Sequence, residues 1–301
     1  MKKSSIVLFA IIAVIALIFL TALFLAFSQN SILPYENSIA VIPVKGEIVS
    51  DSGNVGTDLS AMEIVDSIDE AEKNPSVKAI LLEINSPGGS VVASRQIVEK
   101  IRKTEKPVVA WVSDLGASGA YYVASASDYI IADPDSITGS IGVIAMFPNI
   151  EGLLDKIGVK VKIIKKGAYK AIGSPFQEIS PEEEALIQKL LDGAFERFKA
   201  DVLEFRAEKL NKARFESIAD GRIISGEQAR DTGLIDALGT RDDALKKAAD
   251  IAGIKEYDTT DYSKKELSLI DLLSSMGYSF GTGVKTGFIA SNAQGLSAKV
   301  Q

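Results

Sequence analysis

The sequence contains no cysteine and no histidine among its 301 residues. Without cysteine there is no disulfide bond, no thiolate metal site and no cysteine nucleophile. Without histidine there is no Ser-His-Asp triad, no HExxH zinc site and no imidazole general base. If the protein is an enzyme, its general base must therefore be a carboxylate, a lysine or a tyrosine.

Basic residues are also fewer than acidic ones, 33 against 40, so the formal net charge is −7 and the isoelectric point is near 5.0. Nucleic acid carries a negative backbone and binds basic surfaces. The charge balance therefore predicts that nucleic acid is not a partner.

One long apolar run stands near the N-terminus. Residues Ile6 to Phe27 are 22 consecutive uncharged residues, and only Thr21 is polar. A helix of that length reaches ~33 Å, enough to cross a hydrocarbon core of ~30 Å. A cleaved signal peptide is the alternative, but its apolar region usually has ~7–15 residues and a small-residue cleavage site. Because Lys2 and Lys3 precede the run, we expect a single-pass anchor in the cell membrane, with a cytoplasmic N-terminus and an extracytoplasmic body.

From residue 38 onward, short apolar runs alternate with amphipathic helical stretches. We expect strands at 39–44, 79–84, 107–112, 129–132, 141–146 and 159–164, and helices at 59–73, 91–102, 117–125, 181–209, 225–233 and 241–251. This alternation predicts an α/β fold with a mainly parallel sheet. The chain would divide into a short N-terminus with its anchor (1–30), one folded domain (31–262) and a partly mobile tail (263–301).

Two corners of this pattern could carry chemistry. Residues 85–90, NSPGGS, follow a strand and precede a helix, so their backbone N–H groups could hold an oxyanion or a phosphate. An ordinary turn fits that corner equally well, and the Lys-Ser/Thr pair of a P-loop is absent. Ser118 stands between small residues in a second corner, as in a nucleophile elbow. The alternative for Ser118 is an ordinary helix N-cap.

A lysine is the natural partner for a serine nucleophile when histidine is absent. Its unperturbed pKa of ~10.4 must fall by several units before it accepts a proton, which requires apolar surroundings. Lys165, Lys166 and Lys170 lie close together, and a solvated surface cluster is the alternative for each. Lys170 differs from the other two because it is followed by Ala171-Ile172-Gly173.

Five segments in this order resemble the signal peptide peptidase SppA family over roughly residues 39–252: NSPGGS, GASGAYYVASASDYI, TGSIGVI, KKGAYKAIGSPF and GRIISGEQARDTGLID. The resemblance implies a Clp protease/crotonase-like fold, a Ser–Lys dyad, a ring-like homo-oligomer, and no cofactor or metal. It makes Ser118 the nucleophile and Lys170, 52 residues later, the general base. Ser140 would orient the lysine amine.

The same resemblance implies that the N–H groups of Gly89 and Gly119 form the oxyanion hole, with Gly88 as the alternative to Gly89. The expected function is a serine endopeptidase that degrades cleaved signal peptides and similar apolar peptides at the outer face of the membrane. One alternative is a related membrane Ser–Lys protease with a dedicated protein partner, like the archaeal protease partnered with stomatin. Another is a non-catalytic crotonase-like binding module.

Overall fold

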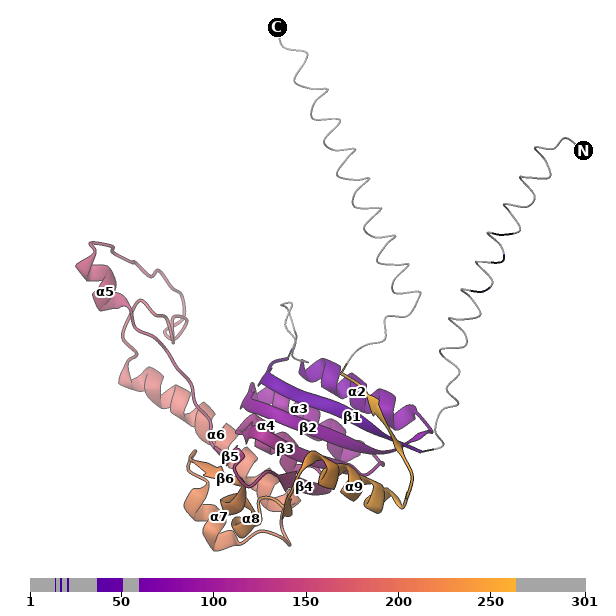
Figure 1. Cartoon of the computed structure of the whole chain (residues 1–301). Coiled ribbons are helices and arrows are strands. Elements are labelled where there is room, and N and C mark those ends of the chain that lie inside the picture. The colour runs from indigo at the N-terminus through magenta and orange to yellow at the C-terminus, as the bar shows by residue number, and fades with distance from the viewer. Residues whose placement is uncertain (1–13, 15–16, 18–20, 22–36, 51–59, 264–301) are drawn as a thin grey trace, which may run out of the picture. The chain divides into compact units, whose positions relative to one another are not determined.

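The structure is a computed structural model that describes residues 37–50 and 60–263, together with Val14, Leu17 and Thr21 (Figure 1). The predicted anchor at 6–27 lies outside the described residues except for those three, and so does the tail from residue 264. Within the described part of the chain, no helix is both long enough and apolar enough to cross a membrane.

The described residues build one sheet of eight strands, in the order β6-β5-β3-β2-β1-β8, with β4 beside β3 and β7 beside β4. The strands are β1 (Ser38–Ile48), β2 (Val77–Gly89), β3 (Val108–Ala117), β4 (Tyr129–Ala132), β5 (Ile137–Gly139), β6 (Ile223–Ser225), β7 (Ala237–Leu238) and β8 (Asp258–Asp261). Every pair is parallel except β5 with β6. The prediction of an α/β fold with a mainly parallel sheet is confirmed.

Helices cover both faces of this sheet (Figure 1). They are α2 (Ala61–Lys73), α3 (Val91–Lys103), α4 (Gly119–Ser125), α5 (Glu151–Lys156), α6 (Pro181–Phe205), α7 (Lys212–Ile218), α8 (Gly226–Thr232) and α9 (Arg241–Ala252). Successive residues of a strand point to opposite faces. Ile42 and Leu82 therefore pack in the larger core with α2, α3 and α4, whereas Val41 and Leu81 pack against α9. Both cores are buried, so each face of the sheet is stabilised by apolar contact.

Local signals in the sequence account for where several helices begin and end. Ser60, Ser180, Ser225 and Thr240 each cap a helix through a reciprocal capping box. Such a box satisfies two backbone N–H groups that have no partner inside the helix. At the other end, α8 and α9 stop at glycines in the left-handed conformation, where a side chain would be strained.

A buried ion pair fixes the end of α6 to the sheet. Arg206 is 1% exposed and donates to Asp236 at 2.8 Å and to the Gly233 carbonyl at 3.2 and 3.1 Å. Asp236 also accepts the backbone N–H of Ile130 at 2.8 Å and pairs with Lys209 at 2.7 Å. Burial alone would raise the pKa of Asp236, but the hydrogen bonds and charges of Arg206 and Lys209 outweigh it and lower that pKa.

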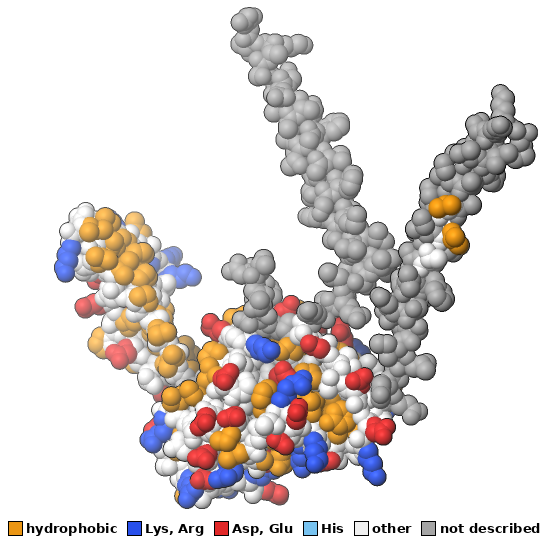
Figure 2. Space-filling view, in the orientation of Figure 1, with side chains coloured by type: hydrophobic (Ala, Val, Ile, Leu, Met, Phe, Trp, Pro, Cys, Tyr) orange, Lys and Arg blue, Asp and Glu red, His pale blue; other side chains and the backbone are white. Residues whose placement is uncertain are grey.

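The predicted strands at 141–146 and 159–164 are wrong. Ile141, at the start of the first run, is buried in the core. From residue 143 both runs lie in an exposed segment that we call the arm (residues 143–180), where no side chain is buried and where the helix α5, which the sequence did not predict, forms. Hydrophobic side chains gather along this arm in Figure 2. The most exposed are Ile144 at 79%, Met146 at 82% and Ile164 at 85%. The apolar runs are real, but no neighbouring strand of the described chain pairs with them.

Helix α6, predicted to reach residue 209, ends at Phe205, and the apolar side chains of its first turns are also exposed. Leu186 and Leu190 are 42% and 74% exposed, whereas Phe198 and Val202 later in the same helix are buried. The periodic apolar face that predicted this helix thus contacts the core only in its second half.

Candidate active site

Ser118 lies at the junction of β3 and α4 in a strained backbone conformation, with φ 53° and ψ −123°. Its N–H donates to the Gly139 carbonyl at 2.9 Å, and its carbonyl accepts the Tyr122 N–H at 2.9 Å. Ser118 occupies the N-cap position of α4, but its side chain makes no capping hydrogen bond to that helix. Strain of this kind persists where the surrounding structure enforces it, and it is typical of a nucleophile elbow.

Ser140 shares this strain and lies beside Ser118. Among the described residues, only these two have positive φ without being glycine, with φ 50° at Ser140. In the parallel pairing of β3 with β5, Ala117 is opposite Gly139, so the two serines follow directly from paired positions. The Ser140 N–H donates to the Arg222 carbonyl at 2.8 Å, which ties this corner to β6.

Three glycines form a tight corner next to Ser118. A Cβ at Gly88, whose φ is +93°, would lie 2.5 Å from the Gly119 nitrogen. A Cβ at Gly119 would lie 2.4 Å from Ser94 Oγ and 3.3 Å from the Gly89 nitrogen. These distances leave no room for side chains, so the backbones of the two loops approach each other directly.

Two N–H groups of this corner are available to a ligand. Ile48 pairs with Gly89 in the parallel ladder, and the Ser90 N–H donates to the Ile48 carbonyl at 2.8 Å. In such a ladder successive N–H groups alternate in direction, so the Gly89 N–H points away from β1. Gly119 is the first residue of α4, and its N–H therefore has no acceptor within the helix. Two such donors beside a serine can stabilise an oxyanion.

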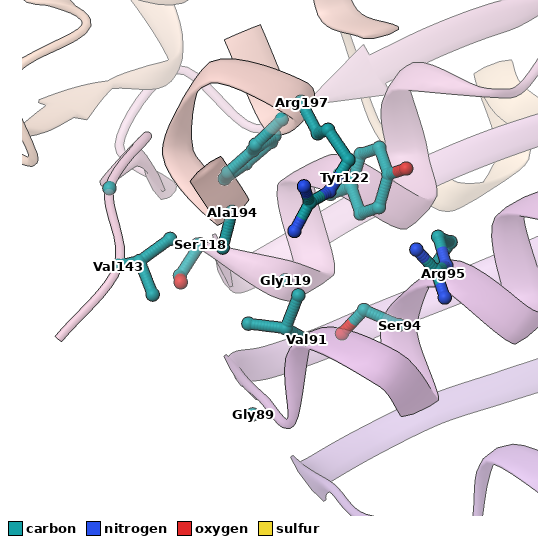
Figure 3. A pocket seen from close by; sticks show the side chains of 12 residues that line it. Gly89, Val91, Ser94, Arg95, Ser118, Gly119, Tyr122, Val143, Ala194 and Arg197 are labelled. Carbon is teal, nitrogen blue, oxygen red and sulfur yellow. The ribbon is translucent and has the colours of Figure 1, made fainter. Parts of the chain in front are cut away.

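A small cavity of about 40 Å³ opens beside Ser118, and we call it the Ser118 pocket (Figure 3). It lies between α3, α4 and α6. Its lining consists of Gly89, Val91, Ser94, Arg95, Ser118, Gly119, Tyr122, Gly142, Val143, Ala194, Arg197 and Phe198. This pocket could not be predicted from the sequence. The helical period placed Phe198 on an apolar face but did not show what that face contacts.

The aromatic wall of the pocket is held in place by one hydrogen bond. The rings of Tyr122 and Phe198 have centroids 5.0 Å apart, and the Tyr122 hydroxyl donates to Asp201. Burial and this hydrogen bond raise the pKa of Tyr122, so its hydroxyl stays protonated at neutral pH. Tyr122 therefore contributes its ring to the pocket wall while Asp201 engages its hydroxyl.

Lys170 is not part of this pocket in the described chain. It lies in the arm, where every residue from 161 to 170 is exposed, and its N–H donates to the Gly167 carbonyl at 3.3 Å. No lysine and no carboxylate lines the Ser118 pocket within the part of the chain that the structure describes. The structure thus brings Ser118, Ser140, Gly89 and Gly119 together and leaves Lys170 apart. Nor do three or more acidic side chains come together as a metal site among the described residues.

A strained serine beside two backbone donors, on a mainly parallel sheet flanked by helices, defines the class as serine hydrolases of α/β architecture. Residues 100–255 match peptidase family S49, and this match includes Ser118, Ser140 and Lys170. The chain belongs to that family, and within it to the signal peptide peptidase SppA group, so it is a peptidase. A second match, to the N-terminal domain of NfeD1b, covers residues 38–152.

Three relatives illustrate the similarity. A provisionally named protease of Methanocaldococcus jannaschii is 41% identical over 223 residues, which are 73% of this chain and 71% of that protein. Protease 4 of Salmonella typhi is 36% identical over 242 residues, or 78% of this chain and 38% of the relative. A provisionally named signal peptide peptidase SppA of Enterococcus faecium is 39% identical over 207 residues, or 65% of this chain and 59% of the relative.

Proposed function

We propose that this peptidase is a membrane-anchored endopeptidase in which Ser118 is the nucleophile and Lys170 the general base. The observation that carries the proposal is the strained Ser118 beside the N–H groups of Gly89 and Gly119. The fold required is the Clp protease/crotonase-like fold that the sequence resembles, and the described α/β sheet is compatible with it.

The proposed reaction is acyl transfer. A neutral Lys170 amine takes the Ser118 proton as Ser118 Oγ attacks the scissile carbonyl, and the two glycine N–H groups hold the developing oxyanion. The protonated lysine then gives its proton to the leaving amine. Water, activated by the same lysine, releases the acyl group from Ser118. The Ser140 hydroxyl would form a hydrogen bond with the lysine amine and so direct that amine at Ser118.

This mechanism requires Lys170 to reach a dry site, which the described chain does not provide by itself. Lys170 is exposed on an arm whose apolar side chains are also exposed. Large exposed apolar surfaces mark sites of association. We therefore place Lys170 of one copy at Ser118 of a neighbouring copy, within a homo-oligomer in which the arm packs on the next subunit. Contact with that subunit would supply the burial that favours a neutral amine.

The proposed substrates are cleaved signal peptides and similar apolar peptides at the outer face of the cell membrane. Support comes from the apolar run at residues 6–27, from the Val91, Tyr122 and Phe198 walls of the Ser118 pocket, and from membership in peptidase family S49. A peptide must leave the helical state before cleavage, because a helix engages its carbonyls in hydrogen bonds.

A second candidate is a membrane protease that cuts one dedicated protein partner. The match to the NfeD1b N-terminal domain includes Ser118 and Ser140. It ends at residue 152, however, before Lys170. The binding-module alternative is disfavoured by the membership in a peptidase family.

The test compares lysines in the same exposed segment. The full chain, purified in detergent, is assayed with an apolar fluorogenic peptide as wild type and as Lys170→Met, Lys165→Met and Lys166→Met. We expect only Lys170→Met to lose activity, by ~10³-fold or more, because it alone removes the general base. Ser118→Ala should lose activity to the same degree and should also lose labelling by a fluorophosphonate. Equal activity of Lys170→Met and wild type would contradict the assignment.

A further inference from the structure

Two arginines reach the Ser118 pocket from different helices. Arg95 comes from α3 and Arg197 from α6, and both belong to the pocket lining (Figure 3). The lining contains no aspartate and no glutamate. The pocket therefore combines two positive charges with apolar walls, in a protein whose net charge is −7.

The carboxylates near the pocket do not neutralise both arginines. Arg95 approaches Glu99 at 3.8 Å, with both side chains about half exposed, so this contact is weak. Asp201 lies on the same helix as Arg197 but accepts the Tyr122 hydroxyl. Arg197 forms no hydrogen bond, ion pair or ring contact with any described residue.

Arg197 is unusual in this respect. Every other arginine within residues 60–263 has a partner: Arg206 with Asp236, Arg222 with Asp220, Arg230 with Asp231, Arg241 with Glu83, Arg214 with the Asp231 carbonyl, Arg102 with the Phe205 ring and Arg95 with Glu99. A guanidinium presents a planar fork of donors that matches a carboxylate. A guanidinium left without a partner beside a nucleophile is thus placed to receive an acidic group of the substrate.

We propose that the Ser118 pocket binds a carboxylate of the peptide substrate, with Arg197 as its main partner and Arg95 assisting. Val91, Tyr122 and Phe198 would contact the apolar stem that carries this carboxylate. The inference rests on the proposed peptidase function and specifies its substrate. Two sources supply the same chemistry: a glutamate side chain next to the scissile bond, or the free C-terminal carboxylate of a peptide already released by an earlier cleavage.

The experiment uses one apolar fluorogenic peptide in matched forms. The first pair has Glu or Gln just before the scissile bond, with an amidated C-terminus. The second pair is the Gln peptide with a free acid or an amide at its C-terminus, a few residues beyond the scissile bond. Within each pair the shape is the same and only the charge differs. For each enzyme, the ratio of kcat/KM within a pair is the measured quantity.

We expect the wild-type full chain to prefer the charged member of one pair by roughly threefold to tenfold at low salt, as partly exposed charge pairs allow. The preferred pair identifies the source of the carboxylate. Arg197→Met should bring that ratio close to one, and Arg197→Lys should give an intermediate ratio because it keeps the charge but loses the fork. Arg230→Met, which removes an arginine outside the pocket, should keep the wild-type ratio. Raising the salt should reduce the preference.

Two results would overturn the inference: ratios near one for both pairs in the wild type, or a preference as large as that of the wild type in Arg197→Met. Failure of the proposed function is distinguishable, because then no member of either pair is cleaved. For that case the same ratios are measured as Kd with the Ser118→Ala chain, using peptides labelled for fluorescence anisotropy. Preferred binding of the charged peptide would support the pocket assignment without turnover, and equal binding would reject it.

Discussion

The glycine corner beside Ser118, formed by Gly88, Gly89 and Gly119, leads to a testable prediction at Gly119. Replacing Gly119 with alanine places a Cβ 2.4 Å from Ser94 Oγ and 3.3 Å from the Gly89 nitrogen. An ordinary contact needs ~3.4–4 Å, so the α4 start must move by about 1 Å or Ser94 must yield. A displacement of ~1 Å misaligns a catalytic donor and costs about 10²-fold. We therefore expect kcat to fall by ~10²–10³-fold, the effect of losing one oxyanion donor.

A double variant separates the steric cause from a general loss of structure. Ser94 is 1% exposed and its hydroxyl has no partner among the described residues, so Ser94→Ala removes the obstacle at little energetic cost. Ser94→Ala/Gly119→Ala should recover about tenfold or more of the kcat that Gly119→Ala loses. The assay is kcat and KM on an apolar fluorogenic peptide, with thermal unfolding measured in parallel. The reasoning is refuted if folded Gly119→Ala keeps kcat within about threefold of wild type, or if the double variant recovers nothing.

Three further predictions concern other parts of the molecule. Ser140→Ala should lower kcat by about 10²-fold and leave fluorophosphonate able to label Ser118 slowly, because only the positioning of the lysine is lost; unchanged turnover would argue against that role. Asp236→Asn should destabilise the fold by ~3–5 kcal/mol in chemical denaturation, since it leaves Arg206 buried without its counter-ion. Because the pKa of Asp236 is lowered in the folded state, its contribution to the free energy of unfolding is complete above the unfolded pKa of ~3.9 and is lost as pH falls through the folded value. If the stability of the wild type falls no faster than that of Asp236→Asn in this acidic range, the account is contradicted. Protein extracted from membranes should retain residues 1–27 by N-terminal mass spectrometry, and a mature chain that begins after residue 27 would show a cleaved leader instead.

Much of the fold could be predicted from sequence because its signals are local. Short, nearly continuous apolar runs marked β1 to β4. Serine caps marked the starts of α6 and α8, and glycines marked the ends of α8 and α9. The short strands β6, β7 and β8 could not be predicted in this way. They have between two and four residues, and their pairing depends on partners far away in the chain.

In the arm, by contrast, the sequence predicted strands that do not form. Its apolar residues at 143–146 and 159–164 have the composition of buried strands, yet none of them is buried within the described chain. An apolar composition predicts that a segment is buried, but it does not identify the surface that would cover the segment. The same limit applies to the site. The motifs that resemble the SppA family implied that Ser118, Ser140 and Gly89 belong to one site. They could not show that Lys170 would lie on an exposed arm.

The central claim is that Ser118 and Lys170 of different copies form one active site. The direct test mixes two inactive full-length variants, Ser118→Ala and Lys170→Met, under conditions that let subunits exchange, and measures peptide hydrolysis. If each site combines the serine of one copy with the lysine of its neighbour, random assembly of equal amounts restores about a quarter of wild-type activity. If the mixture is as inactive as either variant alone although the subunits have exchanged, the dyad does not form between copies.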